Sequence, residues 1–345
     1  MNINDVLVEG IRKDASDVHI VCVLPPLLRV HGKLIRLVDF GKITPDISEI
    51  LLNAIISEEQ RTRLIKERSL DFSHTIPNLG RFRCSYYYQR GTLAGAFRLI
   101  SKKIATVEEL GLPLQIKEFS KYPRGLVLVT GPTGSGKSTT LAAIIELINS
   151  TRSENIITIE DPIEYLFKHD KSIVSQREVA DDTISFNSAL RFVLREDPDV
   201  IMVGEMRDLE TVSGALTAAE TGHLVFSTLH TQDAPQTIDR IIDIFPAHQQ
   251  TQIRTQLATT LRSVLVQQLL PNSRGDGRVV ATELMFVNTA ITNMIRESKA
   301  HQIYNAIQAG GKRGMMTMDM SLAALYKQGM ISRDLCMEKA HNKEE

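Results

Sequence analysis

The chain has 345 residues, of which 43% are hydrophobic, and its 40 lysines and arginines nearly balance 41 aspartates and glutamates, for a net charge of -1. This length is typical of about two domains, and the lack of a strongly basic block argues against nucleic acid as a partner. No apolar stretch approaches the roughly 18 residues needed to cross a bilayer, and the three cysteines (Cys22, Cys84 and Cys336) form neither a disulfide framework nor a zinc pair. The composition favours a reduced cytosolic protein.

The first hundred residues predict an α+β domain. The expected elements are a helix over 3–13, a strand over 18–23, a hairpin over 27–37 about His31-Gly32, helical sequence over 47–64 with Ser57 as an N-cap, and a strand–turn–strand over 80–100 about Arg90-Gly91. The following stretch, 101–123, contains one glycine and two prolines, which predicts a linker.

From Arg124 onward, strands alternate with helices. The predicted strands are 125–130, 155–159, 172–176, 200–203 and 224–228. This alternation predicts a mostly parallel sheet with helices on both faces, over an ATPase core of 124–271. The remainder, 272–345, is expected to be mainly helical after a short strand at 279–286. Ligands of such sheets bind at the carboxyl ends of the strands.

A phosphate-binding pattern follows the first of these strands. Residues 131–138, GPTGSGKS, match G-x-x-x-x-G-K-[ST] at every specified position, and the segment 139–149 has helical apolar spacing. The loop's N–H groups would therefore lie at a helix N-terminus, where a partial positive charge favours a polyphosphate. A glycine-rich turn without a ligand is the alternative. The residues expected to bind ATP are Gly131, Pro132, Thr133, Gly134, Ser135, Gly136, Lys137, Ser138 and Thr139.

Acidic groups follow two later strands. Glu160-Asp161-Pro162-Ile163-Glu164 ends the strand at 155–159, and such carboxylates beside a polyphosphate suggest a balancing Mg²⁺ and a proton-transfer role; a solvated turn is the alternative. Gly204-Glu205 ends the strand at 200–203 and resembles a Walker B motif without its aspartate, so Glu205 would serve the metal or its water; a stray acidic strand end is the alternative. The hydroxyl of Ser138 is a further candidate ligand for Mg²⁺. The strand at 224–228 is flanked by His223 and His230, and His230 lies at its carboxyl end, where it is a candidate γ-phosphate sensor; structural histidines are the alternative.

These motifs together resemble the secretion ATPase superfamily of type II and type IV secretion and type IV pili. Within it, the chain most resembles the pilus retraction ATPases. Ala15-Ser-Asp-Val-His19 with Pro25-Pro26 matches that family's N-terminal domain, and 290–297 is similar to its C-terminal segment Ala-Ile-Arg-Asn-Leu-Ile-Arg-Glu, with Thr292 in place of the first arginine. A tetracysteine zinc module, expected of the extension and type II secretion branches, is missing.

The resemblance implies a PAS-like N-terminal α+β domain and a RecA-like P-loop ATPase domain with C-terminal helices. It implies a homo-hexamer that hydrolyses ATP with Mg²⁺ and engages a pilus platform protein at the cytoplasmic face of the inner membrane. No nucleic acid is expected as a partner, because the net charge is near neutral. Glu164 would be the catalytic glutamate and Glu205 the metal-side acid, while His223 and His230 fall on the family's His box. Arg83 and Arg98 match N-terminal-domain arginines that reach a phosphate, and their alternation predicts one shared sheet face; surface charges are the alternative.

Three rival functions are alternatives to this interpretation. A type IVB secretion ATPase has a similar size and the same site residues. A nucleotide-binding regulator would bind ATP without hydrolysing it. A DNA-translocating motor is disfavoured by the near-neutral net charge.

Overall fold

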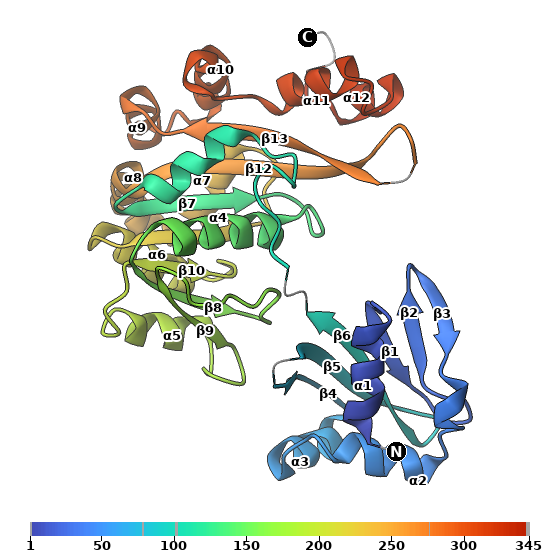
Figure 1. The fold of residues 1–345 in the computed structure, drawn as a ribbon. Helices are drawn as coiled ribbons and strands as arrows, with labels where there is room; N and C mark the ends of the chain where they lie inside the picture. Colours follow the sequence, from blue (N-terminus) through green and yellow to red (C-terminus); the bar gives the residue numbers. More distant parts are fainter. Residues whose placement is uncertain (1, 78, 101–102, 276, 343–345) are drawn as a thin grey trace. The chain divides into compact units, whose positions relative to one another are not determined.

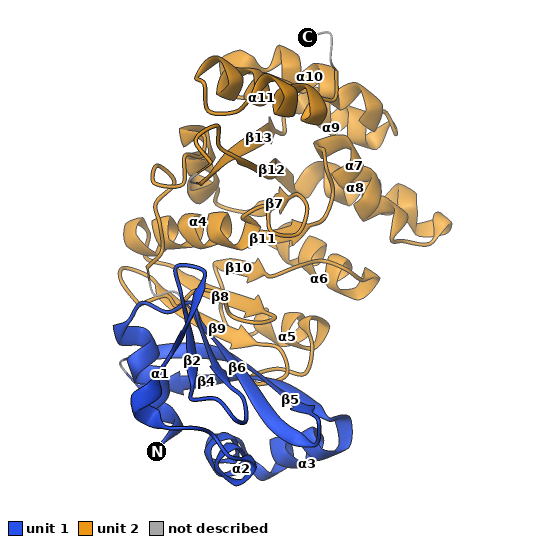
Figure 2. Ribbon diagram, turned by 90° about the vertical axis from the view of Figure 1, so that its right-hand side faces the viewer, with its two compact units in different colours: residues 1–102 blue, residues 103–345 orange. Residues whose placement is uncertain are grey.

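The computed structural model describes residues 2–77, 79–100, 103–275 and 277–342. The chain forms two compact units, Met1–Lys102 and Lys103–Glu345 (Figure 2). Each unit has its own hydrophobic core. The mixed α/β character predicted for both halves is confirmed.

The first unit is a six-stranded antiparallel sheet in the order β3-β2-β1-β6-β5-β4, with helices packed on it (Figure 1). Its strands are β1 (Asp17–Ile20), β2 (Leu27–Val30), β3 (Lys33–Arg36), β4 (Ser69–Ile76), β5 (Gly80–Gln89) and β6 (Thr92–Ile100). Its helices are α1 (Ile3–Arg12), α2 (Pro45–Asn53) and α3 (Glu58–Glu67), with a 3-10 turn at Val38–Phe40.

Local signals account for most of this unit. The predicted helical segment 47–64 is divided into α2 and α3, and the expected N-cap Ser57 begins α3 in a reciprocal capping box with Gln60. Strand β4 was not predicted, although Leu70 and Phe72 alternate with polar residues and are buried. The two predicted hairpins are present as β2–β3 and β5–β6.

The second unit contains a seven-stranded sheet in the order β13-β12-β7-β11-β10-β8-β9. All neighbouring strands are parallel except β12 and β13, as predicted for a mostly parallel sheet. The strands are β7 (Gly125–Thr130), β8 (Asn155–Glu160), β9 (Ile173–Glu178), β10 (Val200–Val203), β11 (Leu224–Leu229), β12 (Leu261–Pro271) and β13 (Arg278–Phe286). The helices are α4 (Lys137–Thr151), α5 (Phe186–Val193), α6 (Leu209–Glu220), α7 (Ala234–Asp243), α8 (Ala247–Thr260), α9 (Thr289–Arg296), α10 (Ile303–Ala309), α11 (Met318–Lys327) and α12 (Arg333–Lys339).

The segment predicted as a linker belongs mostly to this second unit. Val107, Leu112, Ile116 and Phe119 are buried in a core shared with β7 and α4, and Leu114–Lys121 forms a 3-10 helix. The glycine and prolines therefore shape a packed segment instead of a spacer. Ser101 and Lys102, also assigned to the linker, lie outside the described residues.

Strand β12 is the longest strand that the sequence did not predict. Polar residues, including Gln267 and Gln268, interrupt its apolar sequence, yet it lies centrally between β7 and β13. The C-terminal segment with Thr292 forms α9, whose Ile291 and Ile295 are buried in the core. Within the described residues, every helix is too short or too polar to cross a membrane.

Candidate nucleotide-binding site

The phosphate loop joins β7 to α4, in the predicted strand–loop–helix order. Two of its glycines are required by geometry. Gly131 has φ +137°, and a Cβ added there would lie 2.2 Å from the carbonyl oxygen of Gln267. Gly136 has φ +92° and caps the N-terminus of α4. The loop is thus free of side chains where it is most tightly packed, which suits close approach of a ligand to its backbone.

Lys137 is buried and folded back over the loop. Its Nζ donates hydrogen bonds to the carbonyl oxygens of Gly131, at 2.9 Å, and Pro132, at 3.1 Å. Burial lowers the pKa of Lys137, and the negative charges of Glu205 and Glu164 partly offset this effect. The structure therefore brings the two predicted acids within electrostatic reach of the predicted phosphate-binding lysine.

The acidic segment after β8 contains two carboxylates in different environments. Glu160 is buried and accepts hydrogen bonds from Thr158 Oγ1, at 2.6 Å, and Gln176 Nε2, at 3.1 Å. Burial raises its pKa to about 7, against the effect of these bonds. Glu164 is exposed, as a group that meets a ligand or water must be. The predicted role falls on the more accessible of the two.

Glu205 lies in an ion-pair cluster after β10. Its Oε1 forms an ion pair with Arg207 Nε at 2.5 Å, and His230 Nε2 lies 3.3 Å from its other oxygen. Gly204, which stands where the motif usually has an aspartate, is tightly enclosed: an added Cβ would lie 3.3 Å from the carbonyl oxygen of Ile159. The close packing of β8 against β10 thus leaves little room for a side chain at Gly204.

The two histidines occupy opposite ends of β11. His230 follows the carboxyl end, beside Glu205, whereas His223 precedes the strand and its Nδ1 lies 3.0 Å from the carbonyl oxygen of Ala218. At about 3.3 Å per residue, β11 separates them by roughly 20 Å. Within one chain, His230 therefore lies at the edge of the phosphate loop, and His223 does not.

Arg83 and Arg98 are direct cross-strand partners in the first unit. They face each other on β5 and β6, are both exposed, and share a sheet face as predicted. Arg98 Nε donates to Asp17 Oδ1 at 3.0 Å, from the neighbouring strand β1. One end of the Arg98 guanidinium is thereby fixed while its side chain stays 72% exposed.

Three buried polar atoms surround the loop without a hydrogen-bond partner. They are Thr130 Oγ1, Ser135 Oγ and Gln267 Oε1. Among the described residues of the second unit, no other buried side-chain nitrogen or oxygen lacks a partner. Such atoms are rare in native proteins, where an ordered water, an ion or a ligand completes them. Of the three, the hydroxyls of Thr130 and Ser135 can donate as they stand, whereas Gln267 would donate to a polyphosphate through its NH₂ group.

The same edge offers oxygen ligands for a magnesium ion, namely the hydroxyl of Ser138 and the carboxylate of Glu205. Mg²⁺ commonly uses one or two protein ligands together with phosphate oxygens and waters, so these groups suffice. In the described ranges of the chain, His, Cys, Asp and Glu form no group of three that would hold a metal without such help.

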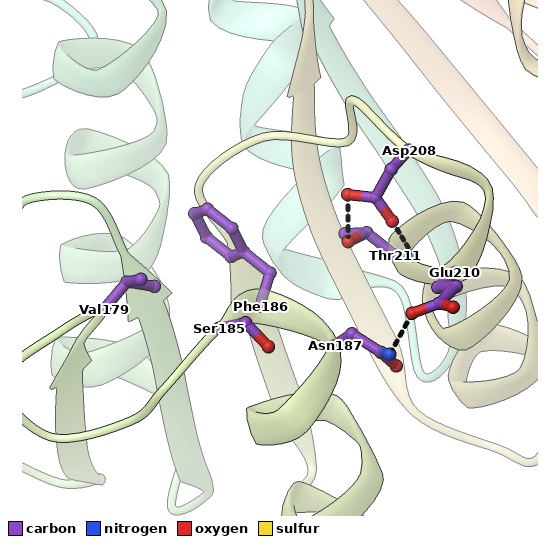
Figure 3. A pocket seen from close by; sticks show the side chains of 7 residues that line it. All are labelled: Val179, Ser185, Phe186, Asn187, Asp208, Glu210 and Thr211. Carbon is purple, nitrogen blue, oxygen red and sulfur yellow. Dashed lines mark hydrogen bonds between the residues drawn. The ribbon is translucent and has the colours of Figure 1, made fainter.

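A shallow pocket lies elsewhere, where α5 and α6 begin (Figure 3). It is lined by Val179, Ser185, Phe186, Asn187, Asp208, Glu210 and Thr211. The Asp208 carboxylate accepts from the backbone N–H of Thr211, at 2.8 Å, and from its hydroxyl, at 2.9 Å, while Asn187 donates to Glu210. These polar groups satisfy one another, and the lining includes none of the predicted site residues.

A parallel sheet, a glycine-rich loop leading into a helix, and two acids near the loop's lysine define a P-loop ATPase. The family described as Type II/IV secretion system protein matches residues 94–332, and the chain belongs to this family.

Similar proteins support the same class over nearly the whole chain. The chain is 48% identical to the Type IV pilus retractation ATPase PilT of Pseudomonas aeruginosa, over 99% of this chain and 98% of that protein. It is 45% identical to a twitching motility protein of Neisseria gonorrhoeae, covering 92% of this chain and 85% of that one.

Two solved structures share the fold. The pilus retraction motor PilT with bound ADP has a TM-score of 0.92 and 50% identity, covering 100% of this chain and 98% of that chain. The Legionella pneumophila ATPase DotB has a TM-score of 0.85 and 28% identity, covering 98% and 95%. The predicted resemblance to pilus retraction ATPases and the predicted two-part fold are confirmed.

Two residues at the site were not predicted. Tyr165 follows Glu164 directly, and its hydroxyl lies 2.8 Å from Thr139 Oγ1 at the start of α4. Gln267 borders the loop from β12. The position of Tyr165 directly after the acidic segment was a signal for the first. Gln267 carried no such signal, because strand β12 was not itself predicted.

Proposed function

We propose that this protein is a Mg²⁺-dependent ATP hydrolase that retracts type IV pili. Hydrolysis is supported by one observation above others. The negative charges of Glu164 and Glu205 both lie close enough to Lys137 to raise its pKa, and Lys137 belongs to the phosphate-binding loop. Retraction is supported by similarity to a named pilus retraction ATPase over nearly the full length of both chains.

Each site residue has a role in this proposal. The loop N–H groups and Lys137 hold the phosphates, and Glu164 orients the attacking water or takes its proton. Ser138 and Glu205 would hold Mg²⁺, which would supply positive charge beside the phosphate oxygens. His230, paired with Glu205, is suited to respond to the γ-phosphate. His223 lies at the other end of β11, so any role it has would not involve the phosphate loop of its own chain.

The assembly is proposed to be a homo-hexamer at the cytoplasmic face of the inner membrane, acting on a pilus platform protein. Arg83 and Arg98 would complete the ATP site of the ring, since added cations stabilise charge that develops in phosphoryl transfer. Their exposed position on one sheet face is consistent with this role.

The test is phosphate release by the purified protein with ATP and Mg²⁺. Lys137→Ala and Glu164→Gln are expected to abolish turnover, and Lys171→Ala, at an exposed lysine, to retain it. Turnover that survives both site substitutions contradicts the mechanism, and binding without turnover in the wild type favours the regulator.

The cellular test is deletion of the gene in its host. Excess pili that do not retract support the proposal, whereas cells without pili contradict it. The type IVB secretion alternative is less well supported, because the similarity to DotB is 28% against 50% for the retraction motor. A normal pilus count together with loss of secretion would favour that alternative.

A further inference from the structure

Strand β12 extends past the end of β7 and forms a wall of the phosphate loop. The two strands are parallel, and Val266 is the register partner of Thr130, the last residue of β7. Gln267, one residue further, therefore lies beside Gly131. Its carbonyl oxygen would be 2.2 Å from a Cβ on Gly131, and its side-chain Nε2 lies 3.8 Å from the position of a Cβ on Gly136. Gln267 thus contacts both ends of the loop.

The side chain of Gln267 is unusual for its place. It is 2% exposed within a core strand, and its Oε1 has no hydrogen-bond partner. A side-chain amide can turn by 180°, which exchanges the positions of its oxygen and its NH₂ group. After such a turn, the NH₂ group of Gln267 would occupy the position that has no partner. Ser135 Oγ and Thr130 Oγ1, the other unpartnered buried atoms of this unit's described residues, belong to the same loop and the strand end before it. The unsatisfied groups therefore gather at a single place.

We propose that Gln267 is a nucleotide-contacting residue, whose side-chain NH₂ group donates a hydrogen bond to a phosphate oxygen of the bound nucleotide. This inference rests on the proposed function, since it requires a polyphosphate in the loop. The NH₂ group adds a side-chain donor to the backbone N–H groups and Lys137. An anionic acceptor strengthens such a bond, and the low polarity of the surroundings strengthens it further.

The chain supplies a matched control. Gln268 is the next residue of β12, and because strand side chains alternate, it faces away from the side that Gln267 occupies. Gln267→Leu removes the donor at similar volume, Gln267→Glu keeps the shape and adds a charge that phosphates repel, and Gln268→Leu makes the same chemical change on the other face.

The measurement is the Kd of the full-length protein for a fluorescent ADP, by titration, with thermal midpoints recorded without nucleotide. We expect Gln267→Leu to weaken binding about tenfold or more, as loss of a hydrogen bond to a charged group does. Gln267→Glu should weaken it further, and Gln268→Leu should change it less than about twofold.

The outcomes separate the two proposals. If the wild type binds and Gln267→Leu binds equally well, the role of Gln267 is wrong while the ATPase proposal stands. If the wild type does not bind, the proposed function fails, and this inference fails with it. Should Gln267→Leu lose its thermal transition, Gln267→Glu decides: wild-type affinity in that variant overturns the inference, and weakened binding with an unchanged thermal midpoint supports it.

Discussion

The hydroxyl oxygen of Tyr165 lies 2.8 Å from the hydroxyl oxygen of Thr139, and this contact joins the acidic segment to the first turn of α4. The backbone on both sides of Glu164 is held in place. Ile163 N donates to Glu178 Oε2 at 2.9 Å, and the carbonyl oxygen of Tyr165 accepts from Gln176 Nε2 at 2.8 Å. The exposed carboxylate of Glu164 therefore projects from a fixed backbone.

Tyr165→Phe is expected to lower kcat for ATP hydrolysis about tenfold, with KM changed less than about twofold. The substitution removes only the bond to Thr139, and small displacements of a group that positions a reactant have large effects on rate. Steady-state phosphate release measures both constants. Tyr326→Phe, at an exposed tyrosine of α11, is the control. A kcat within twofold of the wild type would show that this bond does not position Glu164.

Arg83→Ala and Arg98→Ala are each expected to reduce turnover by at least about tenfold, and by up to ~10³ if the arginine neutralises transition-state charge. The affinity for ADP should change little, because neither arginine belongs to the phosphate loop. Arg90→Ala, in the turn between β5 and β6, is the control. Wild-type turnover in both variants would leave these arginines as surface charges.

The phosphate loop was predictable because its pattern is local, and the parallel strands because each is a short apolar run. Strand β12 was missed because Gln267 and Gln268 interrupt its apolar sequence. The burial of Gln267 can be explained only once the fold shows that it lies beside the phosphate loop. The contact between Tyr165 and Thr139 likewise joins segments that only the folded sheet brings together.

The segment 101–123 was predicted to be a linker because of its turn-forming residues, although it also contains apolar residues that pack in the core. Gly111, Pro113 and Pro123 are turn formers and predict a linker, but Ile116 and Phe119 between them are fully buried. Apolar residues spaced through a glycine- and proline-containing segment indicate packing, and this signal was present in the sequence.

Magnesium dependence gives a separate test of Glu205. Removal of divalent cations with EDTA should abolish ATPase activity, and added Mg²⁺ should restore it. Glu205→Gln is expected to raise the Mg²⁺ concentration for half-maximal activity about tenfold or more, because the carboxylate charge favours the cation. A titration of activity against Mg²⁺ measures this. Glu210→Gln, in nearby α6, is the control, and an unchanged Mg²⁺ requirement in Glu205→Gln contradicts a metal-side role.

Glu283 gives a pH-dependent contribution to stability away from the nucleotide. Its Oε1 accepts from Ala234 N at 2.8 Å, at the first residue of α7, and it also accepts a backbone hydrogen bond from Met318 at the first residue of α11. Burial, with the charges of Asp233 and Asp319, raises its pKa from 4.5 to about 7. Between these two values the folded state holds a proton that the unfolded state has lost.

The sign of the effect follows from this proton. Stability from Glu283 is fully present below pH 4.5 and is lost as pH rises through about 7, by on the order of 3 kcal/mol. Glu283→Gln keeps an oxygen acceptor but cannot ionise. The difference in Tm, wild type minus Glu283→Gln, should therefore fall by several degrees, ~5 °C or more, between pH 5 and pH 8. Thermal unfolding without nucleotide measures it, with the exposed Glu297→Gln as control, and a difference that stays constant across this range would contradict a proton held by Glu283 in the folded state.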